Sequence, residues 1–167
     1  MIDNKTTLVD TTSIKTMFDG LKNKEIINLS NLDTSKLTDI SEILCNYKSL
    51  VTLDISSFNF SNIVDQDSIF FFLSGCNSLK NLQFGKHLKT SVDLSFSKEL
   101  SHESVLSILN GLDEASNINY AALNEKTCKL LNNKDIEIAT DKNWKILSST
   151  ITKHKEFGCE ISYRKIN

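Results

Sequence analysis

The residues best suited to chemistry are cysteines and histidines, and their spacing limits what they could do. They are Cys45, Cys76, Cys128, Cys159, His87, His102 and His154. Successive cysteines lie about 30 to 50 residues apart, which gives neither a CxxC pair nor the spacing of a zinc site. We therefore expect no metal and no cofactor. Buried free thiols are the favoured interpretation, with a disulfide as the alternative.

The other candidates for catalysis have simpler structural explanations. None of the histidines lies in a known motif, and His102 falls in the first turn of a predicted helix, where we expect it to be solvated. The five glycines are isolated, so no phosphate-binding loop is predicted. Asn62, Asp65 and Asp67 lack the glycine and glutamate of a calcium loop and indicate a solvated turn. The sequence predicts a protein that is not an enzyme.

Composition indicates one globular domain with neither nucleic acid nor a membrane as its expected partner. The 167 residues are 40% hydrophobic and 24% charged, with a net charge of −2, which favours neither nucleic acid nor an anionic membrane as partner. The longest apolar run, 69–73, is too short to span a bilayer. The N-terminus shows no signal peptide. We expect a protein that stays in its cell, or a surface or virion component if the chain is a fragment.

Two stretches near the start repeat one pattern of apolar and polar residues. KEIINLSNLDTS ends at Ser35 and LVTLDISSFNFS ends at Ser61. A shift of 26 residues places Ile27 on Leu53, and a further shift of 29 places Leu53 on Leu82. Periods in the twenties with an LxxLxL core are typical of leucine-rich repeats, in which each copy is one short strand and a return segment. One copy cannot bury its own apolar side, so the copies must stack.

The later copies are weaker. Their inward pairs are predicted to be Val92 with Leu94, Ile118 with Tyr120, and Trp144 with Ile146. The step of ten residues from Leu82 to Val92 is too short for a complete copy and indicates an irregular join.

Helix signals and a terminal hairpin complete the expected architecture. Four segments have helical patterns: 11–21, 65–76, 101–112 and 133–143. Ser101 and Asn133 are the expected N-caps of the last two. Residues 144–152 and 157–163 should pair as a hairpin that covers the last copy. The predicted fold is an α/β leucine-rich repeat solenoid with short parallel strands, forming one domain over 1–167: an N-terminal helical cap (1–25), repeats (26–147) and a C-terminal capping strand (148–167).

Four runs of the sequence resemble a known family. They are MFDGLKNKEIINLSNLDTSKLTDIS (17–41), LDISSFNFSNI (53–63), FGKHLKTSVDLSFSKELSHESVLSILNGL (84–112) and DIEIATDKNWKIL (135–147). These runs resemble the BspA-like leucine-rich repeat proteins. The resemblance implies a repeat solenoid, and it implies adhesion to host proteins or cells at a bacterial or protist surface, or a role in phage structural proteins.

The outward positions of the predicted strands would form one polar face. They are Asn28, Ser30, Thr52, Asp54, Ser56, Asn81, Gln83, Asp93, Ser95, Asn119 and Lys145. We expect a non-catalytic module that binds a protein partner through this face. The alternatives are a display scaffold in a secreted adhesin or phage virion, or a phage-encoded inhibitor of a host protein. The face could also be polar only to keep the sheet soluble.

Overall fold

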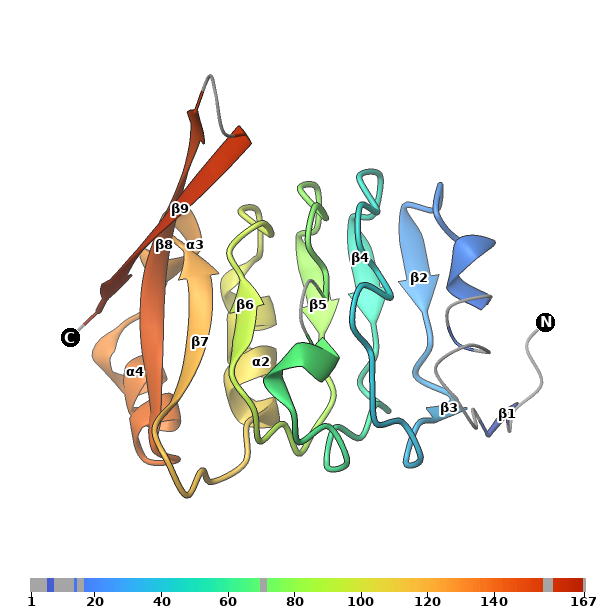
Figure 1. The fold of residues 1–167 in the computed structure, drawn as a ribbon, viewed down its shortest axis with the longest axis horizontal. Helices are drawn as coiled ribbons and strands as arrows, with labels where there is room; N and C mark the ends of the chain where they lie inside the picture. The colour runs from blue at the N-terminus through green and yellow to red at the C-terminus, as the bar shows by residue number, and fades with distance from the viewer. Residues whose placement is uncertain (1–5, 8–13, 15–16, 70–71, 155–157, 167) are drawn as a thin grey trace.

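The computed structural model describes residues 6–7, 14, 17–69, 72–154 and 158–166, and within them the chain has an α/β fold (Figure 1). One sheet pairs β1 (Thr6–Thr7) with β3 (Leu32–Asp33), and a second holds β2 (Ile26–Asn28), β4 (Thr52–Asp54) and β5 (Asn81–Gln83). A third holds β6 (Val92–Leu94), β7 (Asn119–Asn124), β8 (Trp144–His154) and β9 (Gly158–Lys165). The helices whose bounds lie fully within the described residues are η1 (Gln66–Ile69), α2 (His102–Gly111), α3 (Glu125–Cys128) and α4 (Asn133–Thr140).

The sheet β2-β4-β5 confirms the alignment of the first three copies. Its strands are parallel, and Ile27 pairs with Leu53, which pairs with Leu82. All three side chains are buried, while their neighbours along each strand are exposed or half-buried. Alternation along a strand thus sends one apolar residue per copy into a shared core.

A short polar motif turns the chain at the end of these strands. The backbone N–H of Ser30 donates to Asn28 Oδ1 at 3.0 Å, and that of Ser56 donates to Asp54 Oδ1 at 3.0 Å. The same Asx turn follows β6, where Ser95 N–H donates to Asp93 Oδ1 at 2.8 Å. Side chains of Asn and Asp satisfy the backbone amide two residues on, which favours a turn over a longer strand.

The irregular ten-residue step has a structural explanation. Leu82 lies in β5 and Val92 in β6, and these strands belong to different sheets. Between them the chain makes an isolated parallel bridge from Leu88 to Leu112. Ten residues are enough to pass from one sheet to the other but not to build a complete copy, so β6 begins a new sheet.

Helix α2 occupies the position beside β5 that a further strand would otherwise take. The backbone N–H groups of Leu82 and Phe84 donate to Ser104 Oγ and Ser107 Oγ, both at 2.8 Å. In Figure 1, α2 lies behind β6. The serine hydroxyls on α2 therefore replace the carbonyl acceptors of a neighbouring strand.

The predicted inward pair Ile118 and Tyr120 is wrong. In β7, Ala121 pairs with Val92 on one side and with Ile146 on the other, and Ala121 is buried. Ile118 and Tyr120 are exposed. The copies here are 29 and 25 residues apart instead of 26, so β7 is displaced by three positions relative to β6 and by one relative to β8. Because both displacements are odd, the strand presents its opposite face. Trp144 and Ile146 are buried as predicted.

The predicted helices are confirmed in part. Helix α2 begins after the expected N-cap Ser101, whereas the N-cap of α4 is Asn132 and not Asn133. The segment 65–76 has one 3-10 turn, η1, among its described residues. Of 11–21, the structure describes helical backbone at Ile14 and at 17–19; the remainder of that predicted helix up to residue 16 lies outside the described residues.

The C-terminal hairpin is confirmed by antiparallel pairing of β8 with β9. In Figure 1 this hairpin forms the end of the molecule opposite the N-terminus. Phe157 lies outside the described residues. No helix in the described part of the chain combines the length and hydropathy needed to cross a bilayer.

Candidate functional site

Five predicted site residues gather on the outward side of the β2-β4-β5 sheet, which we call the first-sheet face. The register places Thr52 beside Asn81, and it places Asp54 between Asn28 and Gln83. Asn81 Nδ2 donates to Thr52 Oγ1 at 3.2 Å. Ile26 also lies on these strands and is 69% exposed, next to Thr52 in register.

The other predicted site residues are elsewhere. Ser30 and Ser56 lie in the turns beyond β2 and β4, and Asp93 and Lys145 lie in the β6–β9 sheet. The outward position predicted for Asn119 is wrong, because this half-buried residue lies on the same side of β7 as buried Ala121 and pairs with Trp144. The predicted face is therefore divided between two sheets. Its residues are polar partly because the turns require them: Asn28, Asp54 and Asp93 each accept a backbone N–H.

The exposed position predicted for Ser95 is wrong. Ser95 is 0% exposed, and its Oγ has no hydrogen-bond partner among the described residues. The Asx turn that begins at Asp93 ends the alternation of inward and outward side chains at Leu94. Ser95 is therefore buried although it follows the buried Leu94. Ser95 cannot contact a partner in this conformation.

A cavity of about 340 Å³ opens on the outward side of the β6–β9 sheet, which we call the cavity face. Its lining residues come from η1 and from all four strands of this sheet, β6, β7, β8 and β9, whose order can be followed in Figure 1. Its lining is mostly apolar and aromatic, formed by Gln66, Ile69, Ser74, Ser91, Val92, Asp93, Phe96, Tyr120, Ala122, Leu147, Ile161 and Tyr163.

Two exposed tyrosines contribute aromatic rings to the cavity face. Tyr120 is 40% exposed and Tyr163 is 48% exposed, and both line the cavity. Tyr163 Oη donates to Asp93 Oδ2 at 2.5 Å, which ties β9 to β6 across the sheet. Burial raises the pKa of Tyr163, and the bond to the Asp93 carboxylate raises it further. Tyr163 therefore stays protonated and remains a donor at neutral pH.

Sequence reasoning missed the cavity face because β7 is displaced by an odd number of residues from its predicted register. The predicted register turned Tyr120 into the core, which removed the aromatic residue that most favours a binding surface. The clue in the sequence is NYAAL, in which the alternate residues Ala121 and Leu123 can fill the core as well as Ile118 and Tyr120. Periodicity cannot choose between these two faces.

Two histidines pair with aspartates of a later segment. His87 Nδ1 and Asp113 Oδ1 are 3.2 Å apart, and His102 Nε2 and Asp135 Oδ2 are 2.8 Å apart. Asp135 also accepts the N–H of Asn132, its partner in the capping box of α4. Each pair joins segments far apart in sequence, so both have a structural role. The side chain of His154 lies outside those that the structure describes.

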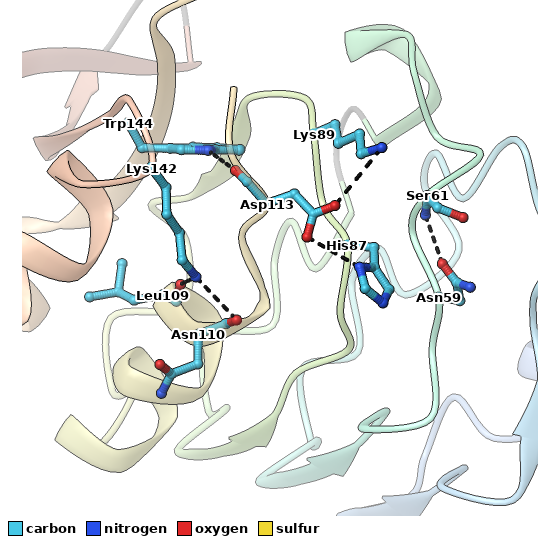
Figure 2. Close-up of polar contacts among 9 residues, drawn as sticks. All are labelled: Asn59, Ser61, His87, Lys89, Leu109, Asn110, Asp113, Lys142 and Trp144. Atoms are coloured by element: carbon cyan, nitrogen blue, oxygen red, sulfur yellow. Dashed lines mark hydrogen bonds and ion pairs between the residues drawn. The ribbon is translucent and has the colours of Figure 1, made fainter. Parts of the chain in front are cut away.

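Figure 2 shows how the His87 pair belongs to a structural network. The carboxylate of Asp113 lies between His87 and Lys89, and Asp113 Oδ2 is 3.9 Å from Lys89 Nζ. The backbone carbonyl of Asp113 accepts Trp144 Nε1–H at 2.8 Å. Nearby, Lys142 Nζ donates to the carbonyl of Leu109 at 3.0 Å, near the end of α2. These bonds hold β8, α2 and the segment after β5 together.

The three thiols that the structure describes are poor nucleophiles. Cys45, Cys76 and Cys128 are free, and burial raises the pKa of each. The pKa of Cys76 reaches about 12, and its Sγ donates to the carbonyl of Leu44 at 3.0 Å. Tyr47, one copy earlier, donates in the same way to the carbonyl of Phe18. The predicted packing role of Cys76 agrees with this arrangement.

Metal ligands do not gather in the described part of the chain: it has no group of three His, Cys, Asp or Glu placed to hold an ion. The side chain of Cys159 lies outside the described ones.

Comparison with known proteins gives one family. A family model described as "Mycoplasma protein of unknown function, DUF285" matches residues 12–93. That segment runs from before β2 to within β6 and leaves out most of the β6–β9 sheet. No curated protein matches the chain. No solved structure matches it.

Proposed function

We propose that this chain is a non-catalytic, leucine-rich-repeat-type module that binds a protein partner through its cavity face. The fold part of the proposal is supported by parallel strand partners that recur 25 to 29 residues apart and by one continuous apolar core. Stacked copies of this kind are extended scaffolds whose exposed strand faces bind partners.

The cavity with its two exposed tyrosines carries the functional part of the proposal. Protein interfaces depend on a few aromatic residues beside a well-formed pocket, and Tyr is one of the residue types enriched there. Tyr120 and Tyr163 combine large exposed rings with a cavity of about 340 Å³. The first-sheet face has polar side chains already engaged in turns, and its exposed large apolar residue is Ile26.

The test compares matched substitutions on the two faces. Immobilised parent chain, Tyr120→Ser and Ile26→Ser are used to capture proteins from a lysate of the source organism. We expect Tyr120→Ser to reduce recovery of the captured partner at least about tenfold, as loss of an aromatic hot spot does. Ile26→Ser should leave recovery unchanged.

Both substituted side chains are exposed, so each variant should keep its free energy of unfolding within about 0.5 kcal/mol of the parent. Urea unfolding checks this. Equal recovery by Tyr120→Ser and parent, with loss in Ile26→Ser, would assign binding to the first-sheet face instead.

A further inference from the structure

The chemistry of the cavity identifies the group that it would receive, and this inference rests on the proposed function. We propose that the cavity accepts one basic side chain, with arginine preferred to lysine, from an extended segment of the partner. The carboxylate of Asp93 would bind the charged end, and the aromatic walls would hold the rest of the side chain.

The charge of the cavity supports a cationic guest. Among the described residues that line it, Asp93 is the only one with an acidic or basic side chain. The surrounding surface is mostly apolar, which strengthens the attraction between opposite charges relative to open water. Lys145 lies beside Tyr120 in register but does not line the cavity. An anionic guest would find no cation among the lining residues to pair with.

Asp93 has acceptor capacity to spare. Its Oδ1 accepts the N–H of Ser95 and its Oδ2 accepts the hydroxyl of Tyr163. A carboxylate offers about four acceptor positions, so each oxygen can take a further donor. The bond from Tyr163 also fixes the direction of the carboxylate. Asp93 is exposed to solvent, so an incoming guanidinium can reach its carboxylate.

The walls suit the long stem and flat head of arginine. Tyr120, Tyr163 and Phe96 present aromatic rings, which attract cations over their faces. Leu147 and Ile161 offer aliphatic contacts for the methylene groups. A planar guanidinium can stack on a ring and bind a carboxylate through two N–H groups, whereas an ammonium cannot.

The size of the cavity also favours a side chain over a cofactor. Its volume of about 340 Å³ is near the lower end of the roughly 300–1,000 Å³ typical of small-molecule sites. One side chain with part of its backbone fits this space, and the flanking residues of the segment would lie along β6 and β7.

Titration with model peptides tests the inference. Blocked pentapeptides of glycine and serine, with arginine, norleucine or glutamate at the centre, are added to the isotope-labelled full chain and followed by NMR. We expect the arginine peptide to shift the amide signals of Tyr120, Ala122 and Tyr163. The norleucine peptide should bind about two- to fivefold more weakly, because it keeps the apolar stem but loses the ion pair. The glutamate peptide should produce no shifts.

A matched pair of substitutions tests the role of Asp93. Asp93→Asn keeps an acceptor for Ser95 but removes the charge, and it should weaken arginine-peptide binding about fivefold. Asp54→Asn makes the same change in the equivalent turn of the first-sheet face, where Ser56 N–H is bound. It should leave peptide binding unchanged.

The possible failures are distinguishable. Equal binding of arginine and norleucine peptides at the same amides, or no effect of Asp93→Asn, overturns the basic-residue inference while leaving the cavity face as the binding surface. The absence of any peptide binding also overturns the inference, and the Tyr120→Ser capture result then decides the proposed function alone. Shifts confined to β4 and β5 contradict both.

Discussion

At the scale of single residues, this chain is shaped by side chains that satisfy the backbone at its turns. Besides the turns after β2, β4 and β6, Asp33 accepts the N–H of Ser35 and Asn59 accepts that of Ser61. All of these residues follow one pattern, Asn or Asp followed two positions later by Ser. The pattern is visible in the sequence and predicts the turns. It also explains why polar strand-end residues alone do not identify a binding face.

Gly85 marks a close approach between neighbouring copies. A Cβ atom there would lie 2.2 Å from the carbonyl oxygen of Phe58, which accepts the N–H of Lys86. We expect Gly85→Ala to lower the free energy of unfolding by about 2 kcal/mol or more, because backbone must move to relieve the clash. Gly20→Ala is the control, since its Cβ would make an ordinary contact at 3.7 Å. Equal urea midpoints for the two variants would contradict this packing.

Asp135 should make stability depend on pH. The N–H of Asn132 and, to a lesser extent, His102 hold the pKa of this carboxyl below its usual value. A folded-state pKa below the unfolded one means that the stabilisation is present above the unfolded pKa and is lost as pH falls through the folded value. We therefore expect Asp135→Asn to destabilise the protein at neutral pH, with a difference from the parent that shrinks below about pH 4.

Urea unfolding of parent and Asp135→Asn across this pH range measures that difference. The exposed Asp19 provides a control, and Asp19→Asn should change stability little at any pH. A difference for Asp135→Asn that stays constant down to about pH 3 would show that the ionised carboxyl contributes nothing.

At the scale of elements, register separates what the sequence could predict from what it could not. Strands β2, β4 and β5 follow the alignment because each has a large, buried apolar residue at its centre, Ile27, Leu53 or Leu82. In β7 the core is filled by the small Ala121, while the large Tyr120 faces outward. The large size of Tyr120 therefore led to the prediction that it faces the core, and the cavity that it lines was not predicted.

Helix α2 could be predicted as a helix but not as the neighbour of β5. Its cap and apolar side are local signals, whereas its contact with β5 depends on Ser104 and Ser107, which are ordinary residues in a helix. That a helix takes the place of a strand beside β5 depends on tertiary contacts, which the periodicity of the sequence does not predict.

The serines of α2 give a prediction at this scale. Ser104→Ala should lower the free energy of unfolding by about 1–3 kcal/mol, because it leaves the buried N–H of Leu82 without its acceptor. Ser104 Oγ also donates to the carbonyl of Lys80 at 2.9 Å, so a second bond is lost. Ser49→Ala, at an exposed position, is the control. Equal urea midpoints for Ser104→Ala and the control would mean that the hydrogen bond from β5 to Ser104 does not stabilise the fold.

At the scale of the whole molecule, the β2-β4-β5 and β6–β9 sheets share one core but present different outer faces. The repeat spacing predicted the shared core, because it places one apolar residue of each copy inward. The alternation of apolar and polar residues near the C-terminus predicted the hairpin. It could not predict that the sheet breaks after β5, nor that the cavity forms between η1 and the β6–β9 sheet. Those features depend on contacts between segments far apart in sequence, such as Tyr163 with Asp93.

Site-specific photo-crosslinking tests the central claim most directly, because it reports which face touches the partner. A benzophenone amino acid replaces Tyr120 on the cavity face in one protein and Ile26 on the first-sheet face in another. After irradiation in lysate of the source organism, we predict one dominant adduct from position 120 and none of that mass from position 26. An adduct from position 26 alone would contradict the assignment of binding to the cavity face.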